Sequence, residues 1–366
     1  MKEKHRYHIL GIPHTITSKN YVACAYTQKV LKFGKMMTDL GHEVIHYGHQ
    51  DSELQCTEHV NVLDREYYNM SYGDHDFHSH LFKFDQNKDL AYLIFWENAC
   101  KEIEKRKQQD DFLLPFWGWG VKPICDAHKD MIIVEPGIGY GSGYVSDYKI
   151  FESYAIYHAY CGLDSVMTCQ QRWQDTVVPN YFDEDDFTYN DKKEDYFLYL
   201  GRVYEGKGVH IAMAITEKIG ARLFIAGQMD PNKPMDIPDH CSYVGYADQP
   251  TRRKLLSNAK ALFLPSQYLE PFGGVQIEAL LSGTPTITSD WGAFTENNHN
   301  GMTGFRCRTI GDYLWAAKNI DQIQPSTCRH FGMGYTLPHI GKRYEKYFSE
   351  VLQHERIQRQ RAGSAL

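Results

Sequence analysis

The sequence lacks any apolar run that approaches the about 20 residues of a membrane-spanning helix. Its opening, Met1-Lys-Glu-Lys-His-Arg6, leads into a short apolar stretch that is not typical of a signal peptide. The nine cysteines are odd in number and include no Cys-x-x-Cys pair, so neither a disulfide framework nor a zinc site is indicated. These absences predict a cytoplasmic protein with reduced thiols and no transmembrane segment.

An excess of positive charge is also missing, because the formal net charge is −7. The chain therefore has no general attraction to nucleic acid or anionic lipid, although its net charge does not exclude a local basic patch. Lys29, Lys32 and Lys35 follow one another at helical spacing and hint at such a patch. They would suit a peripheral contact with a membrane, or they form an ordinary solvated face.

Two further signatures of bound groups are absent or weak. A dinucleotide-dependent dehydrogenase needs Gly-x-Gly-x-x-Gly after its first strand, whereas this chain reads Gly11-Ile-Pro-His. The acidic run Asp183-Glu-Asp-Asp186 lies in a polar linker, and we interpret it as a solvated loop rather than a metal site. We therefore predict no metal and no resident cofactor.

What the sequence does contain is a regular alternation of strand and helix patterns in two halves. The 366 residues exceed what one core usually holds. A break at Val178-Pro-Asn180 and the polar stretch 183–195 separate the halves. We predict an α/β fold of two Rossmann-like domains facing a central cleft, with residues 1–178 and 190–340. A charged amphipathic helix within 342–366 would pack back on the first domain.

The predicted elements place the site. In the first half we expect strands at 7–10, 44–46, 112–115, 131–134 and 165–168, and helices at 23–40, 89–107 and 151–161. In the second half we expect strands at 196–200, 223–226, 243–244, 261–264 and 286–288, and helices at 209–219, 251–258, from 274 and at 342–359. Ligands bind beyond the carboxyl ends of parallel strands, so we expect the site in the cleft between the domains.

The segment Glu270-Pro-Phe-Gly-Gly-Val-Gln-Ile-Glu278 carries the most information about function. It reads as a glycine-containing loop that feeds a helix, where backbone N–H groups favour an anion. A carboxylate stands at each end and can accept hydrogen bonds from hydroxyl groups. Such a layout suits a diphosphate between two hydroxyl-rich rings, as in a nucleotide-sugar.

A second segment, Gly201-Arg-Val-Tyr-Glu-Gly-Lys-Gly208, follows the first strand of the second half. Arg202 and Lys207 lie in the loop at the carboxyl end of that strand. A guanidinium fork and a compact ammonium group together could neutralise a leaving diphosphate.

These segments resemble the retaining family 4 glycosyltransferases of the GT-B fold. Gly201-Arg202…Lys207-Gly208 is similar to their basic loop, and Glu270…Glu278 to their Glu-x7-Glu signature. Pro179-Asn180, the strand ending at Pro265-Ser266 and Ser282-Gly-Thr-Pro285 fit in order, although Tyr181 stands where the family usually has Gly. The resemblance in sequence covers roughly residues 177–308. In the first half of the chain only the order of predicted strands and helices resembles the family.

The resemblance implies a role for each matching residue. Arg202 and Lys207 would bind the donor diphosphate and stabilise its charge as the glycosidic bond breaks. Glu270 would bind sugar hydroxyls and Glu278 the ribose hydroxyls. Backbone groups would complete the donor site at Gly201, Phe272, Gly273, Gly274 and Val275, and near the base at Tyr243 and Gly245.

The first half departs from the family pattern. The usual Gly-Gly loop after strand one is replaced, so a donor contact of Gly11 rests on position alone. Glu135 stands about where relatives carry a His near the donor sugar, followed by a Gly/Tyr-rich loop that reaches Tyr144. We expect Glu135 either to bind hydroxyls or act as a base in the cleft, or to hold a structural turn.

The sequence thus predicts a glycosyltransferase that moves a sugar from a nucleotide-diphosphate-sugar co-substrate, with retention, to an unidentified acceptor. A glycan, lipid-linked, protein or small-molecule acceptor is open, and a nucleic-acid acceptor is disfavoured but not excluded. The alternative is a catalytically inactive nucleotide-sugar-binding module.

Overall fold

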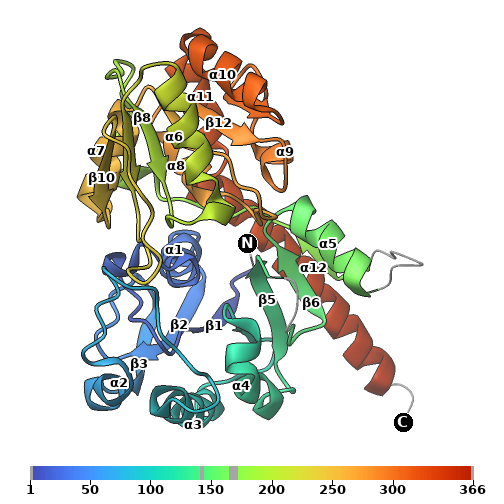
Figure 1. Cartoon of the computed structure of the whole chain (residues 1–366). Helices are drawn as coiled ribbons and strands as arrows, with labels where there is room; N and C mark the ends of the chain where they lie inside the picture. Colours follow the sequence, from blue (N-terminus) through green and yellow to red (C-terminus); the bar gives the residue numbers. More distant parts are fainter. Residues whose placement is uncertain (1–2, 141–143, 165–171, 364–366) are drawn as a thin grey trace.

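The computed structural model describes residues 3–140, 144–164 and 172–363, which form two parallel sheets with helices on both faces (Figure 1). The first sheet has the strand order β3-β2-β1-β4-β5-β6-β7 and the second has the order β10-β9-β8-β11-β12-β13. All the strand pairs of both sheets are parallel, as predicted from the strand–helix alternation.

The first domain consists of the strands β1 (Arg6–Leu10), β2 (Glu43–His49), β3 (Glu58–Leu63), β4 (Phe112–Leu114), β5 (Ile132–Ile138), β6 (Tyr148–Phe151) and β7 (Asp175–Val177) and the helices α1 (Ala25–Asp39), α2 (Arg65–Tyr72), α3 (Leu90–Glu104), α4 (Lys122–Ala127) and α5 (Tyr154–Asp164). Apolar side chains of α1 pack on one face of the sheet. Those of α3 and α4 pack on the other face.

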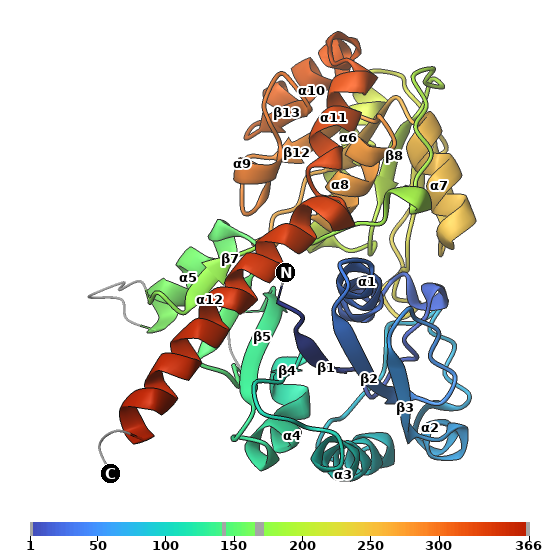
Figure 2. The same ribbon diagram turned by 180° about the vertical axis from the view of Figure 1, so that it is seen from behind.

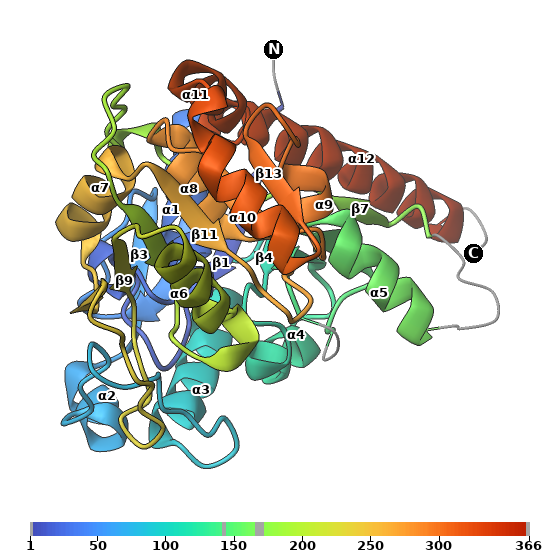
Figure 3. The same ribbon diagram turned by 45° about the horizontal axis from the view of Figure 1, so that its top comes forward.

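The second domain consists of the strands β8 (Phe197–Leu200), β9 (Leu223–Ala226), β10 (Cys241–Gly245), β11 (Ala261–Leu264), β12 (Thr286–Ser289) and β13 (Gly304–Cys307) and the helices α6 (Val209–Lys218), α7 (Gln249–Asn258), α8 (Gly274–Leu281), α9 (Phe294–Asn297), α10 (Ile310–Asn319) and α11 (Pro325–Met333). Figure 3 shows α6 and α10 together over this sheet, where they share a core with the strands. Leu256 of α7 belongs to the core of the opposite face.

The last helix, α12 (Leu337–Gly363), leaves the second domain and lies across the first (Figure 2). Its side chains Tyr344, Phe348 and Val351 are fully buried in the core that α1 shares with the first sheet. The predicted packing of the C-terminal helix on the first domain is confirmed. The helix begins earlier than the sequence indicated, because Pro338 occupies its first turn, where proline is tolerated.

Two chain crossovers connect the domains and bond to each other. The Phe182 N–H donates to the Tyr335 carbonyl at 3.0 Å, and the Leu337 N–H donates to the Phe182 carbonyl at 3.0 Å. Next to them Tyr181 is buried, and its hydroxyl donates to the Lys29 carbonyl at 2.9 Å. The tyrosine that departs from the family pattern therefore ties the crossover to α1.

The sequence located several elements well and missed others. It gave the bounds of β9 and β11 as the structure has them. It missed the strands β3, β6, β7 and β13 and the helices α2, α4 and α9 to α11, and it ended β5 too early because Pro136-Gly137 reads as a break. The strand expected at 165–168 lies outside the described residues.

Candidate active site

The site is built around the place where the strand order of the second sheet reverses. β8 and β11 are neighbours there, although β9 and β10 come between them in the chain. Loops that leave such a pair diverge and open a crevice beyond the strand ends. Arg202 and Lys207 follow β8 and Glu270 follows β11, so all three line one pocket of about 480 Å³ between the two domains.

Lys207 and Glu270 are bonded directly to each other in this pocket. Lys207 Nζ donates to Glu270 Oε2 and to the Tyr268 hydroxyl, both at 2.8 Å. Glu270 also accepts from the hydroxyls of Tyr268, at 2.8 Å to Oε1, and Ser266, at 3.1 Å to Oε2. Burial, followed by the negative charge of Glu270, raises the pKa of Tyr268, which therefore stays a hydrogen-bond donor.

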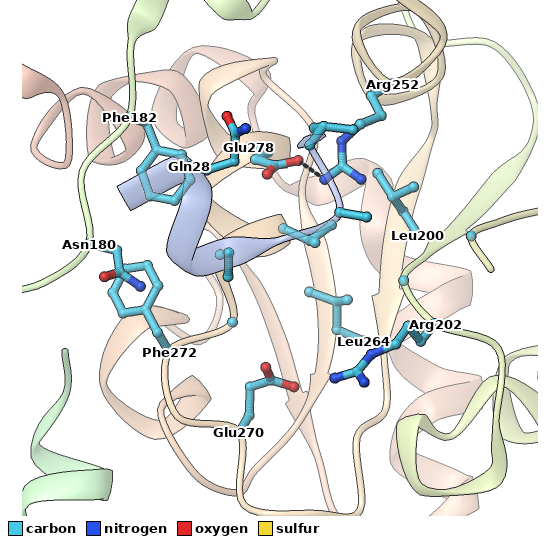
Figure 4. A pocket seen from close by; sticks show the side chains of 18 of the residues that line it. Gln28, Asn180, Phe182, Leu200, Arg202, Arg252, Leu264, Glu270, Phe272 and Glu278 are labelled. Atoms are coloured by element: carbon cyan, nitrogen blue, oxygen red, sulfur yellow. Dashed lines mark hydrogen bonds and ion pairs between the residues drawn. The ribbon is translucent and has the colours of Figure 1, made fainter. Parts of the chain in front are cut away.

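Arg202 faces the pocket differently (Figure 4). Among the described residues none forms a hydrogen bond or ion pair with its guanidinium group, and the side chain is exposed. Its five donors are therefore available for a ligand. The position of Lys207 depends on the next residue, Gly208. Its φ of +73° lets the backbone turn into α6, and it packs so closely on the Pro265 carbonyl that no Cβ would fit.

The start of α8 forms the floor between the two carboxylates. Gly273 has a φ of +77°, and a Cβ atom there would lie 2.4 Å from the Phe294 ring. No side chain from the described part of the chain caps this helix, so its first N–H groups, at Gly274 and Val275, point to an open anion position. Phe272 and Gly201 complete this part of the lining.

Glu278 lies at the other end of the pocket, where Arg252 of α7 meets it (Figure 4). The Arg252 Nη2 to Glu278 Oε2 distance is 2.5 Å. Lys32 of α1 lines the pocket nearby, and burial lowers its pKa while Glu278 and Asp186 oppose that shift. Sequence reasoning missed Arg252 because only the packing of α7 against α8 brings the two residues together.

The first domain supplies the facing wall. Gln28, Lys29 and Lys32 of α1, with Glu152 and Asn180, line the pocket. The hypothesis that Lys29, Lys32 and Lys35 form a basic surface is wrong. Lys29 is buried and bonds to Glu152 at 2.6 Å, Lys32 faces the cleft, and Lys35 pairs with Asp39 at 3.0 Å.

Several predicted site residues lie away from the pocket. Glu135 is fully buried within β5, where it accepts from the Tyr140 hydroxyl and, at 2.8 Å, from the Val145 N–H. The expectation that Glu135 faces the cleft is wrong. The alternative, that Glu135 holds a structural turn, agrees with its hydrogen bonds from Tyr140 and Val145. Of the Gly/Tyr-rich loop, residues 141–143 lie outside the described residues.

Gly11, Tyr243 and Gly245 are not among the described pocket residues either. Gly11 is buried beside β2, and Tyr243 donates its hydroxyl to the Gly227 carbonyl at 2.9 Å. Tyr246 and Gln228 line the pocket instead. The connection between α2 and α3 reaches them: Gln228 donates to the His80 carbonyl at 3.0 Å, and the His78 and Tyr246 ring centroids lie 4.8 Å apart.

The acidic run at 183–186 is only partly solvated, because Asp186 is buried and accepts from Lys19 at 2.9 Å. Within the described ranges no three His, Cys, Asp or Glu side chains are grouped as a metal site would need. A search of the same residues found no helix with the length and apolar character to cross a membrane.

Two Rossmann-like domains with a cation-lined pocket between them define a protein of the GT-B type. Residues 182–323 match the family model for glycosyl transferases group 1, and the second domain belongs to that family. The predicted resemblance to GT-B glycosyltransferases is thereby confirmed for this part of the chain, and retention of the anomeric configuration stays a prediction.

One curated relative is similar to this chain in sequence, and two solved structures are similar to it in fold. A glycogen synthase of Mycobacterium tuberculosis is 38% identical over 122 residues, which are 30% of this chain and 29% of the relative. The matched segment thus spans less than a third of that protein. AviGT4, a glycosyltransferase involved in avilamycin A biosynthesis, superposes with a TM-score of 0.68 and 17% identity, over 95% of this chain and 98% of its own. Anabaena Alr3699/HepE, solved in complex with UDP and glucose, superposes with a TM-score of 0.65 and 11% identity. The superposition covers 94% of this chain and 100% of HepE.

Proposed function

We propose that the protein transfers a sugar from a nucleotide-diphosphate-sugar to an acceptor. The observation that carries this proposal is the meeting of Arg202, Lys207 and the uncapped start of α8 in one pocket, with a carboxylate on each side. Cations and helix N–H groups bind a diphosphate, and carboxylates bind the hydroxyls of a sugar and a ribose. The UDP and glucose held by the structurally similar HepE support this donor class.

In the proposed reaction the diphosphate leaves as the glycosidic bond breaks. Arg202 and Lys207 stabilise the charge that develops on it, so little acid catalysis is needed. Glu270 holds Lys207 in place and binds the sugar hydroxyls through its remaining acceptor capacity. Glu278 accepts hydrogen bonds from the ribose hydroxyls, and these replace part of its hydrogen bonding with Arg252.

Three finer features belong to the same proposal and come from the family resemblance. The anomeric configuration is retained by attack of the acceptor on the face from which the diphosphate leaves. The nucleotide-sugar is a co-substrate, and no resident cofactor takes part. Side-chain cations take the place that a metal ion holds in other phosphate chemistry, so turnover should persist in EDTA.

A nucleotide-release assay with UDP-, GDP-, ADP- and TDP-sugars tests the proposal. We expect Lys207→Ala and Glu270→Ala each to lower turnover at least about 100-fold, because both remove charge from the diphosphate and sugar positions. Lys218→Ala, which removes an exposed lysine at the end of α6, is the matched control and should keep full activity.

Near-normal turnover in both site variants would contradict the assignment. Thermal stabilisation by a nucleotide-sugar without any nucleotide release would instead identify a binding module. Once the donor nucleotide-sugar is known, the nucleotide-release assay is repeated with glycan, lipid-linked, protein and small-molecule acceptors. A nucleic-acid acceptor is included in the same screen.

A further inference from the structure

A buried polar cluster that no donor role uses lies on the first-domain wall of the pocket. Glu152 follows β6 directly and is 5% exposed, and Lys29 of α1 is 6% exposed. Glu152 Oε2 accepts from Lys29 Nζ at 2.6 Å and from Asn180 Nδ2 at 2.7 Å. The three side chains come from a strand end, a helix and the domain crossover, so tertiary structure alone brings them together.

The cluster is held rigidly. Lys29 also donates to the Gly137 carbonyl at 2.7 Å, and its Nζ lies 4.3 Å from the centre of the Tyr26 ring. The Glu152 N–H donates to the Ile138 carbonyl at 3.1 Å. Buried charges that are paired and bonded in this way are preorganised. The lysine's hydrogen-bonding capacity is thus largely used by the protein itself.

Two acceptor atoms of the cluster are unused. No described residue donates to Glu152 Oε1, which rests against Gly139, where an added Cβ would lie 2.1 Å away. Asn180 Oδ1 is buried and has no partner among the described residues. Because Asn180 Nδ2 donates to Glu152, the orientation of this amide is fixed with its oxygen free. A buried acceptor without a donor is costly, so a ligand that donates is favoured here.

The charge of the cluster indicates the kind of donor. Lys29 already balances Glu152, so an ammonium group gains little, and the carboxylate disfavours an anion. Neutral hydroxyl groups, one for each free oxygen, satisfy both oxygens without adding charge. Figure 4 shows Asn180 and Phe272 on one side of the pocket, opposite Arg202 and Arg252. Of the two residues with free acceptors, Asn180 therefore stands away from both arginines.

On the basis of the proposed function, we propose that Glu152 and Asn180 form the acceptor subsite and bind hydroxyl groups of a neutral sugar. Glu152 Oε1 and Asn180 Oδ1 accept from two hydroxyls of that sugar, and Lys29 positions Glu152. This subsite occupies the role that the sequence had suggested for Glu135. It involves binding and orientation of the acceptor, whereas the donor groups remain those of the second domain.

Binding of methyl glycosides to the full-length chain tests the subsite. The probes are methyl α-D-glucopyranoside, methyl α-D-mannopyranoside and methyl α-D-galactopyranoside, measured by saturation-transfer NMR in the presence of UDP. We expect the protein to bind at least one probe and Glu152→Gln to weaken it about tenfold or more, as loss of a hydrogen bond to a charged group does. Glu345→Gln, which alters a carboxylate of α12 that bonds to His42 outside the pocket, should bind as the unaltered protein does.

A second variant guards against misfolding. Gly139→Ala leaves Glu152, Lys29 and Asn180 in the sequence but places a Cβ 2.1 Å from Glu152 Oε1, so the carboxylate has to move. The variant should weaken the same probe while its melting temperature shows that it is folded. The dissociation constant of the nucleotide-sugar, from thermal shift, should change less than about twofold in both variants.

The outcomes are distinct. Failure of all three glycosides to bind, or unchanged binding in Glu152→Gln, overturns the subsite. A parallel loss of nucleotide-sugar affinity overturns it too, because Glu152 would then belong to the donor site. If the glycosides bind through Glu152 but no nucleotide is released from any donor, the proposed transferase activity fails and the sugar subsite stands.

Discussion

At the scale of single residues, two carboxylates on neighbouring strands have opposite fates. Glu135 lies within β5, fully buried, with hydrogen bonds from Tyr140 and Val145, and no lysine in the described part of the chain bonds to it. Glu152 follows β6 and is balanced by Lys29. Burial raises the pKa of Glu135 to about 7, since the charged form loses its hydration there. Position in the sheet, rather than residue type, separates a structural carboxylate from a pocket one.

The raised pKa of Glu135 makes stability depend on pH. Its ordinary pKa is 4.5, so the folded chain holds this proton more tightly than the unfolded chain does. The resulting contribution to the free energy of unfolding is complete below about pH 4.5 and is lost as the pH rises towards 7. We therefore expect Glu135→Gln to unfold at a higher urea concentration than the unaltered protein at pH 8, with a smaller advantage at pH 5.

Urea denaturation at both pH values measures this difference. Glu97→Gln is the control, because Lys101 lowers the pKa of that exposed carboxyl and no gain at pH 8 should follow. A difference between Glu135→Gln and the unaltered protein that does not change with pH would contradict the burial argument.

At the scale of elements, the start of α8 combines a left-handed turn, which glycine adopts without strain, with the proposed anion position. Gly273 takes a left-handed conformation that L side chains adopt at a cost, and the Phe294 ring closes the space where a Cβ would stand. The same turn orients the first N–H groups of the helix. Glycine here therefore serves backbone geometry and ligand access together.

Replacing Gly273 with alanine should harm both stability and donor binding. Gly220→Ala is a matched control, because its φ is +65° but nothing lies within 4 Å of an added Cβ. We expect about 1 kcal/mol lost in Gly220→Ala from the backbone alone. Gly273→Ala should lose more in urea denaturation and should also give a smaller thermal shift with a nucleotide-sugar. Equal losses and equal shifts in the two variants would show that the Phe294 contact and the anion position are unimportant.

At the scale of the whole molecule, the chain passes between the domains twice, and its last helix completes the first one. Phe348 of α12 is fully buried, with its ring 4.8 Å from that of Tyr7 and 5.0 Å from that of Phe112. The first domain therefore depends on residues that follow the second in the sequence. The two crossovers, bonded at Phe182, fix where the walls of the pocket meet.

Phe348→Ala tests this dependence. A cavity in a fully buried aromatic position costs about 3–5 kcal/mol. We expect hydrogen exchange to accelerate in β1 and β4 of the first sheet far more than in β8 and β11 of the second. Ile357→Ala, at a position that is 39% exposed, should leave exchange unchanged. Uniform acceleration in both sheets would show that the domains unfold as one unit.

Short-range patterns explain what could be predicted. The strands β9 and β11 are brief apolar runs between turn residues. The loop 201–208 after β8 and the segment 270–278 are each a continuous stretch of fewer than ten residues, so their residues are recognisable without knowledge of the fold. β6 and β13 are short strands with lysine or arginine in them, so their periodicity is weak. Tyr268 could have been suspected, since it stands two residues before Glu270 in the same loop.

The sequence by itself determined the two parallel sheets and the residues with which the second domain lines the pocket, because these depend on local periodicity and on loops at strand ends. Only the tertiary structure decided which first-domain side chains face them. Lys29 looked like a surface lysine and Glu135 like a cleft carboxylate, yet the packing of α1 on the first sheet buries Lys29 against Glu152. Contacts between residues so far apart in the chain depend on how helices pack, and no local pattern encodes them.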